Sequence, residues 1–135
     1  MHRKGTPRTM QVNPRYKNVT REVLDFFQER LFYIRKAGVH DVMVDPGFGF
    51  GKTVEHNFSL LKSLRLFGML DAPLLVGVSR KSMINKVLGT TPENALNGTT
   101  ALHTLALLHG ARILRVHDVK EALEAVELVS KYRQV

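Results

Sequence analysis

Three short apolar segments, each ending in polar residues and followed by a helical pattern, constrain the fold of this chain most. They cover residues 42–44, 74–78 and 113–116. Strands that are almost wholly apolar are typical of parallel sheets, because helices bury both faces of such a sheet. The element order is one helix, then strand and helix three times over. This order predicts an α/β fold.

Apolar residues at helical spacing and turn-forming residues define the segments between the strands. Residues 1–17, with Gly5, Pro7 and Pro14, are expected to form a loop. The expected helices contain Leu24 to Ile34 ending before Gly38, Leu60 to Leu64, Ser82 to Leu88, a long helix that Thr91 caps and Pro92 starts and that ends before Gly110, and a last helix lined by Val119, Leu123, Val126 and Val129. Capping residues, proline at the first helical position and glycine after the last one support these boundaries.

Composition places the chain among ordinary globular domains. It has 135 residues, of which 44% are hydrophobic and 24% charged, a usual size and balance for one domain. Its apolar runs are shorter than the roughly 18–20 residues that a membrane span needs, and its first eleven residues lack the apolar core of a secretory signal. There is no cysteine, which excludes disulfides and thiolate metal sites. We therefore expect a cytoplasmic protein without a membrane partner.

The net charge of +8 is concentrated near the start of the chain. Residues 1–36 carry nine Lys or Arg against three Asp or Glu. This excess fits either a solvated basic surface or an anionic ligand. The basic residues are not interleaved with aromatic ones, so phosphate is favoured over nucleic acid, and no nucleic-acid partner is expected.

Polar residues gather where each predicted strand ends. The first strand leads to Asp45, Gly47 and Gly49, the second to Gly77, Ser79, Arg80 and Lys81, and the third to Arg115, His117 and Asp118. The carboxyl ends of parallel strands lie at one edge of a sheet, where such folds bind their ligands. These residue types predict a site for a ligand with anionic and hydrogen-bonding parts.

The glycine-rich stretch "DPGFGFGKT" is not a nucleotide phosphate loop by its spacing. The motif G-x-x-x-x-G-K-[ST] needs glycine where Pro46 stands, and the spacing G-x-G-x-G differs from the dinucleotide fingerprint. A plain glycine-rich turn is the alternative. Asp45, at the end of the strand, is interpreted as a hydrogen-bond acceptor for a ligand.

The other two strand ends carry cations. Ser79, Arg80 and Lys81 stand beside a helix N-terminus, which favours anions, although a basic cap on a surface loop gives the same pattern. Strand alternation places Arg115 and His117 on the same side, which suits phosphate or pyrophosphate. A purely structural histidine is the alternative for His117, and no ligand cluster supports a metal site there.

Together, "DPGFGFGKT", "LLVGVSRKSMI" and "RVHDV" resemble the corresponding segments of dihydropteroate synthases in order and spacing. The resemblance extends over nearly the whole chain, because "MHRKGTPRTMQ" is similar to the family's Met-His-x-x-Gly-x-Pro loop. It implies an eight-stranded (β/α) barrel. It also implies an enzyme of folate synthesis, the target of sulfonamide drugs, that joins 6-hydroxymethyl-7,8-dihydropterin pyrophosphate to p-aminobenzoate and releases pyrophosphate.

The resemblance implies a role for five residues around the pterin. Asp45 accepts hydrogen bonds from the aminopyrimidine edge, Lys81 donates to the ring, and Arg115 lies against it. Met1 and Gly77 line the pterin pocket.

The remaining implied roles concern the pyrophosphate and the p-aminobenzoate. Arg115 and His117 hold the pyrophosphate, so that they and Lys81 are the implied catalytic residues. Ser79 and Arg80 lie near the p-aminobenzoate, with Phe50 packed on it.

The resemblance further implies an incomplete barrel, because such a barrel takes about 250 residues. Residues 1–135 then form a partial pterin-binding domain: a loop over 1–17 after a missing fifth strand, and a helix with three strand–helix units over 18–135. The Asn that binds Mg²⁺ belongs to the missing part, and the last two helices form a homodimer face. The isolated chain is expected to be inert. Its alternative roles are to bind pterin or pyrophosphate without catalysis, or to complete a partner's barrel.

Overall fold

The computed structural model describes residues 1–6, 8–10 and 12–135 of the chain. Pro7 and Gln11 lie outside the described residues. The described part of residues 1–17 contains turns and bends but no helix or strand, as the sequence predicted. No helix in the described part of the chain is both long and apolar enough to cross a membrane.

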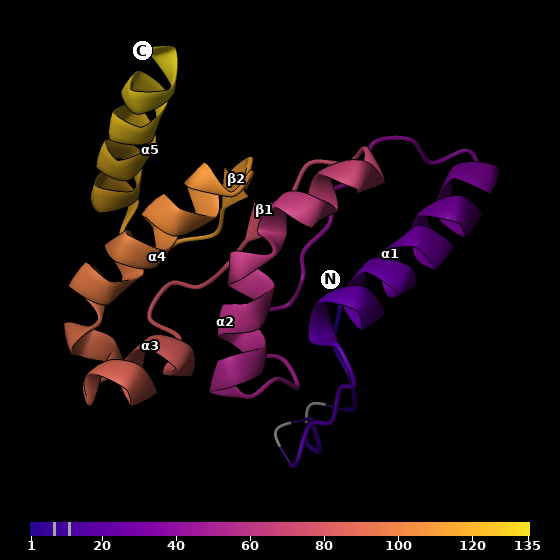
Figure 1. Cartoon of the computed structure of the whole chain (residues 1–135), viewed down its shortest axis with the longest axis horizontal. Coiled ribbons are helices and arrows are strands. Elements are labelled where there is room, and N and C mark those ends of the chain that lie inside the picture. The colour runs from indigo at the N-terminus through magenta and orange to yellow at the C-terminus, as the bar shows by residue number, and fades with distance from the viewer. Residues whose placement is uncertain (7, 11) are drawn as a thin grey trace.

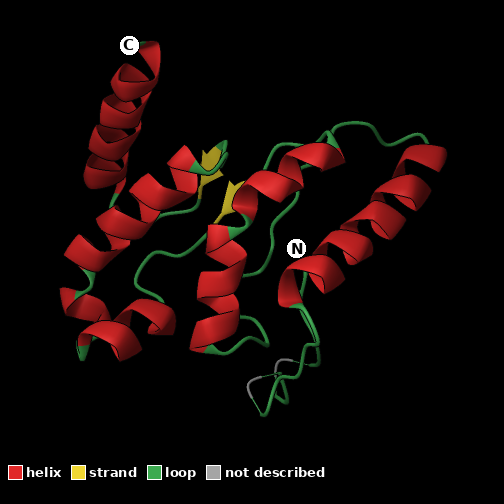
Figure 2. Cartoon of the chain, viewed as in Figure 1, coloured by secondary structure: helices red, strands yellow, loops and turns green. Residues whose placement is uncertain are grey.

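Most of the regular structure is helical, and the strands are short, as Figure 2 shows. The α-helices are α1 (Val19–Lys36), α2 (Val54–Lys62), α3 (Ser82–Leu88), α4 (Leu96–Leu108) and α5 (Val119–Gln134). Two 3₁₀ helices are η1 (Leu64–Leu70) and η2 (Pro92–Asn94), and the strands are β1 (Leu75–Val76) and β2 (Ile113–Leu114).

The strands are parallel and are paired in chain order. Val44 forms an isolated parallel bridge with Leu74, and β1 pairs with β2 so that Leu75 lies opposite Ile113 and Val76 opposite Leu114. The predicted α/β arrangement is therefore observed, with strands shorter than expected. The ladder ends early because the backbone after Val76 bends into the loop that carries Ser79 and Arg80, where Arg80 adopts a φ of +55°.

The first helix forms as the sequence predicted. The Asn18 side chain caps it by accepting a hydrogen bond from Arg21 N at 3.0 Å, and Glu22 accepts another from Lys17 N at 2.7 Å. These bonds satisfy backbone donors that a helix start leaves unpaired. The helix ends before Gly38, whose φ of +85° is a conformation that glycine adopts readily.

The second helix ends earlier than expected and has a cap that the apolar pattern did not reveal. Thr53 and His56 form a reciprocal capping box, with 3.1 Å from His56 N to the Thr53 hydroxyl and 3.2 Å from Thr53 N to His56 Nδ1. The helix ends at Lys62, so Leu64 belongs to η1 instead.

The long helix expected from Pro92 is divided in two. Pro92 starts η2 after Thr91, but Thr91 makes no side-chain cap, and α4 begins only at Leu96. The guanidinium of Arg80 donates to Pro92 O at 2.7 Å and to Glu93 O at 2.9 Å. In a continuous α-helix these carbonyls would accept from backbone amides four residues later, and the side chain of Arg80 replaces those bonds.

The last helix buries a different face from the one predicted. Its buried residues are Ala122, Ala125 and Val129, whereas Val119 and Leu123 are exposed. The stripe predicted from Val119 to Val129 was therefore wrong except at Val129. Two alanines let α5 approach α4 closely, so packing selects the face with small side chains over the face with larger ones.

The helices pack against one another in chain order. Contacts run from α1 to α2 and η1, from α2 to α3, from α3 to α4 and from α4 to α5, and Figure 1 shows the chain progressing from α1 at one side of the view to α5 at the other. One large apolar cluster includes Phe27, Phe67 and Ile84, and a smaller one joins α4 to α5 through Leu107, Ala125 and Val129.

Substitution of the buried Phe67 tests this core directly. Its side chain is 0% exposed and meets the ring of Phe27 edge-on at 6.3 Å between centroids. We expect Phe67→Ala to lower the free energy of unfolding by about 3–5 kcal/mol, because it removes buried surface and leaves a cavity. Chemical denaturation measures this loss. The control is Phe32→Ala, at a residue 63% exposed, with an expected change of about 0.5 kcal/mol or less. Equal losses would contradict the assigned core.

Candidate functional site

The glycine-rich loop after Val44 is fixed by side chains on both sides of it. Asp45 Oδ1 accepts from Gly47 N at 2.8 Å, and Asn57 Oδ1 accepts from Gly49 N at 2.8 Å. Gly47 has a φ of +71°, and a Cβ added there would lie 1.8 Å from the carbonyl oxygen of His2. The loop therefore needs glycine at this position, and it holds the Asp45 carboxylate in one orientation.

Lys81 reaches this loop from the second strand end. Its ammonium donates to the carbonyl of Phe48 and lies 4.7 Å from the ring centroid of Phe50. Burial lowers the pKa of Lys81 to about 8, although the negative charge of Asp45 acts in the opposite direction. The positive charge of Arg115 lowers this pKa further. The structure thus brings together four of the predicted site residues: Asp45, Phe50, Lys81 and Arg115.

Ser79 and His117 form a second pair at the strand ends. The Ser79 hydroxyl lies 2.8 Å from His117 Nδ1, and it also accepts from the backbone N–H of His117 at 3.3 Å. A hydroxyl that accepts from the backbone can donate its own hydrogen to Nδ1. That arrangement leaves the proton of a neutral ring on Nε2, from which it can be donated to a ligand.

Gly77 and Met1 lie at the edges of the same region. A Cβ added to Gly77 would lie 3.6 Å from Arg115 Cβ, so the ends of β1 and β2 approach closely there. Met1 is half exposed, and its Cγ would lie 3.4 Å from a Cβ added to Gly47. Gly77 is therefore adjacent to Arg115, and Met1 is adjacent to the glycine-rich loop.

The guanidinium of Arg80 forms an ion pair with Asp118. Its Nε donates to Asp118 Oδ2 at 2.9 Å and its Nη2 to Asp118 Oδ1 at 2.7 Å, while Nη1 binds the carbonyls before α4. These bonds raise the pKa of Arg80 and hold the pKa of Asp118 below its usual range. Asp118, at the end of the third strand, thus serves as the counter-ion of Arg80.

Lys52 and His2 form a buried cluster that the sequence pattern did not predict. The ammonium of Lys52 donates to Gly47 O at 2.9 Å and to Phe50 O at 3.2 Å, and it lies 3.2 Å from His2 Nδ1. Thr53, the next residue, caps α2. The lysine of "GKT" therefore points into the protein and the threonine caps a helix, so the stretch is not a nucleotide phosphate loop. The sequence feature that could have indicated this cluster is a lysine placed between a glycine-rich turn and a helix cap.

The described residues do not fit a divalent cation. Among them, no group of three or more His, Asp or Glu side chains could hold a metal ion. Besides the Arg80–Asp118 ion pair, the strand ends combine the carboxylate of Asp45 with the cations Lys81 and Arg115, a set that attracts anions more than Mg²⁺.

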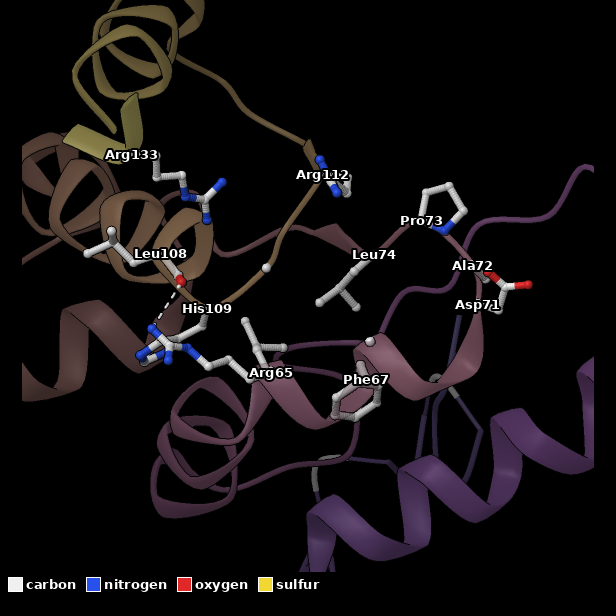
Figure 3. Close-up of a pocket in the computed structure, with 13 residues that line it drawn as sticks. Arg65, Phe67, Asp71, Ala72, Pro73, Leu74, Leu108, His109, Arg112 and Arg133 are labelled. Atoms are coloured by element: carbon white, nitrogen blue, oxygen red, sulfur yellow. Dashed lines mark hydrogen bonds between the residues drawn. The ribbon is translucent and has the colours of Figure 1, made fainter. Parts of the chain in front are cut away.

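A cavity of about 440 Å³ lies away from these residues, at the opposite ends of the strands. Leu74 and Arg112, which precede the two strands, line it together with Arg65 and Arg133 (Figure 3). Arg65 and Arg133 donate to the last carbonyls of α4, so their charges stabilise the helix C-terminus. None of the site residues predicted from the sequence lines this cavity.

Parallel strands whose carboxyl ends present Asp45, Lys81, Arg115 and His117 define an α/β protein with charged and polar side chains gathered at one edge of its sheet. Residues 1–117 match the family described as pterin binding enzyme. The chain belongs to this family.

Similar proteins agree with this assignment. The dihydropteroate synthase of Escherichia coli (strain K12) is 47% identical over 131 residues, which are 96% of this chain and 46% of that protein. The Yersinia pestis dihydropteroate synthase in complex with a sulfonamide drug has a TM-score of 0.95 and 40% identity, over 98% of this chain and 49% of that one.

A third similar protein was solved with a pterin compound. The dihydropteroate synthase of Xanthomonas albilineans, in complex with 7,8-dihydropteroate, has a TM-score of 0.87 and 39% identity, over 90% of this chain and 48% of that one. The chain thus spans about half the length of the relatives it matches.

Because His2 is buried, we predict that the free energy of unfolding depends on pH. Burial and the positive charges of Lys52 and Lys4 lower its pKa to about 4, against an opposing contribution from Glu22. Between pH 6.5 and 4 the unfolded chain takes up a proton at His2 that the folded chain does not. Stability is therefore lost as the pH falls through this range, by about 2–3 kcal/mol.

Urea denaturation at pH 7 and pH 4.5 checks this loss. In His2→Asn the decrease in the free energy of unfolding should be smaller than in the wild type, because residue 2 no longer titrates. His40→Asn, at an exposed histidine, is the control and should follow the wild type. If the wild type and His2→Asn lose the same free energy, His2 is not the group responsible.

Proposed function

We propose that this chain supplies part of the active site of a dihydropteroate synthase, as the C-terminal portion of a (β/α)₈ barrel. The reaction joins 6-hydroxymethyl-7,8-dihydropterin pyrophosphate to p-aminobenzoate and releases pyrophosphate. The observation that carries the proposal is the convergence of Asp45, Lys81, Arg115 and His117 at the strand ends of a chain that belongs to the pterin binding enzymes. Residues 1–135 form, in this proposal, one partial domain.

The pterin is oriented by Asp45 and Lys81. The bond from Gly47 N fixes one oxygen of the Asp45 carboxylate. A carboxylate offers about four acceptor positions, so it can also accept N–H groups from the aminopyrimidine edge. The Lys81 ammonium, on the other side of the glycine loop, donates to the ring. Fixed partners of this kind favour reaction by holding the methylene carbon in the geometry for attack.

The pyrophosphate is stabilised as it leaves. The arylamine nitrogen attacks the methylene carbon and forms a C–N bond, the C–O bond breaks, and the electron pair leaves with the pyrophosphate. Arg115 and the Nε2–H of His117, oriented by Ser79, donate to the oxygens on which the charge accumulates. The arylamine then loses its extra proton to the solvent or to the pyrophosphate. Donors aimed at a developing charge are a large contribution to catalysis of this type.

The p-aminobenzoate lies, in this proposal, near Ser79, Arg80 and Phe50. Phe50 supplies an aromatic face held in place by Lys81. The guanidinium of Arg80 is bound by Asp118 and by two carbonyls, so its contribution is to fix the loop that carries Ser79. The proposal assigns no Mg²⁺ ligand to this chain.

Calorimetry with the pterin pyrophosphate tests the proposal. We expect the 135-residue chain to bind this ligand, and Lys81→Met and Arg115→Met to weaken binding by about tenfold each, which is about 1.4 kcal/mol. Lys62→Met, at an exposed lysine of α2, is the matched control. Absence of binding by the wild type would contradict the proposal. Formation of dihydropteroate by this chain alone would contradict the incomplete barrel, because we expect no turnover.

We further propose that α4 and α5 form a homodimer face. An apolar groove of about 370 Å³ runs between the two helices, and Leu128 and Tyr132, which line it, are 73% and 70% exposed. Large exposed apolar side chains that border one groove are typical of protein interfaces.

Sedimentation velocity tests this interface. We expect the wild type to sediment as a dimer, and Leu128→Glu to raise the dissociation constant at least about tenfold, because a charge must be desolvated. The control is Val87→Glu on α3, also at an exposed apolar residue, which should leave the dimer intact. A monomeric wild type, or equal effects of both substitutions, would exclude this face.

A further inference from the structure

Lys52 and His2 are buried titratable residues to which the proposed reaction gives no role. Their side chains are 4% and 6% exposed, so neither faces the ligand region directly. A buried ammonium is costly unless its donors are paired. The three donors of Lys52 have three acceptors within 3.2 Å: Gly47 O, Phe50 O and His2 Nδ1. The pairing is complete, so the cluster has a defined geometry.

The acceptors belong to two segments that are far apart in the sequence. Gly47 and Phe50 begin and end the turn of the glycine-rich loop, where Phe50 N also donates to Gly47 O at 3.1 Å. His2 belongs to the N-terminal segment, whose backbone N–H donates to Asp45 O at 2.9 Å. Lys52 therefore connects the turn that carries Phe50 to the segment that is bonded to Asp45.

The two lysines near the loop act on different carbonyls. Lys81 binds Phe48 O from the side of the strand ends, and Lys52 binds Gly47 O and Phe50 O from within the protein. Lys81, which is assigned to the pterin, has further donors that a ligand can engage. The donors of Lys52 are all engaged within the protein, so it can hold the loop with or without the ligand.

We propose that Lys52, with His2 as its acceptor, is a positioning residue that fixes the glycine-rich loop so that Asp45 and Phe50 face the substrates. The effect that Lys52 is expected to have on ligand binding rests on the proposed function. The pair touches no substrate and acts through Gly47 and Phe50. The same cluster explains why the loop carries lysine at position 52 although it binds no nucleotide phosphate.

Chemical replacement of the ammonium tests the inference. The chain has no cysteine, so Lys52→Cys can be alkylated at its single thiol with bromoethylamine in the unfolded state and then refolded. Alkylation restores an ammonium at nearly the length of lysine. Lys62→Cys, at an exposed position of the next helix, passes through the same treatment as the control.

Amide hydrogen exchange of residues 47–50, measured by NMR, is the first readout. We expect exchange of the Phe50 amide to be at least about tenfold faster in Lys52→Cys and to return towards the wild-type rate after alkylation. The Lys62→Cys control should match the wild type at every stage. Unchanged exchange in Lys52→Cys, or no recovery on alkylation, overturns the inference whether or not the chain binds a pterin.

Affinity for the pterin pyrophosphate is the second readout. If the wild type binds, Lys52→Cys should bind about tenfold more weakly and the alkylated form should recover. Faster exchange with unchanged affinity would overturn the positioning role while leaving the proposed function intact. A wild type that does not bind contradicts the proposed function alone, because the exchange result stands by itself. If Lys52→Cys fails to refold, Lys52→Gln and Lys62→Gln allow the same comparison without refolding.

Discussion

Backbone hydrogen bonds between three short parallel segments determine where the candidate site residues at the strand ends lie. Leu75 N donates to Val44 O at 2.8 Å, and Arg115 N donates to Val76 O at 2.9 Å. These bonds fix the register of neighbouring segments, and a one-residue shift would turn each following side chain to the opposite face. Asp45, Ser79 and His117 can meet at one edge only in this register. The helices contribute by burying the segments, but the ladder sets the positions.

The charges around this edge are divided into neutralised and available ones. Arg80 and Asp118 neutralise each other in a two-bond ion pair, and that pair also interrupts the helix before α4. The pKa of Lys81 is raised by the carboxylate of Asp45 and lowered by the second cation, Arg115. The edge therefore keeps a net positive charge although one of its cations is consumed structurally. An anionic ligand can supply the missing counter-charge without desolvating an existing ion pair.

The sequence predicted what depends on local pattern and missed what depends on long-range contacts. The α/β order, the strand ends, and the glycine after α1 follow from apolar periodicity and turn chemistry. The interruption before α4 does not, because its cause is the side chain of Arg80, twelve residues from Pro92. The buried face of α5 was also missed, since a helix with apolar residues on more than one side offers no local sign of which side α4 will cover.

In the candidate site, too, the features set by local pattern were predicted and those set by long-range contacts were missed. Strand order was enough to place Asp45, Lys81, Arg115 and His117 at one edge. The burial of Lys52 could not be predicted, because its third acceptor, His2, is 50 residues away in a loop without secondary structure. A lysine in a glycine-rich stretch is ordinarily expected to face solvent or phosphate. Only the three-dimensional contact with the N-terminal segment shows that it faces inwards.

The contacts that complete the site therefore join residues far apart in the sequence, and this has a consequence for the order of folding. Ser79 and His117 are 38 residues apart, whereas the caps of α1 and α2 join residues three apart. Closing a long loop costs entropy before its contacts give any return, so local helices form sooner than distant pairs. The helices can thus be ordered while the ligand-binding edge is still open. A nascent or partly unfolded chain would lose its site before it loses its helices.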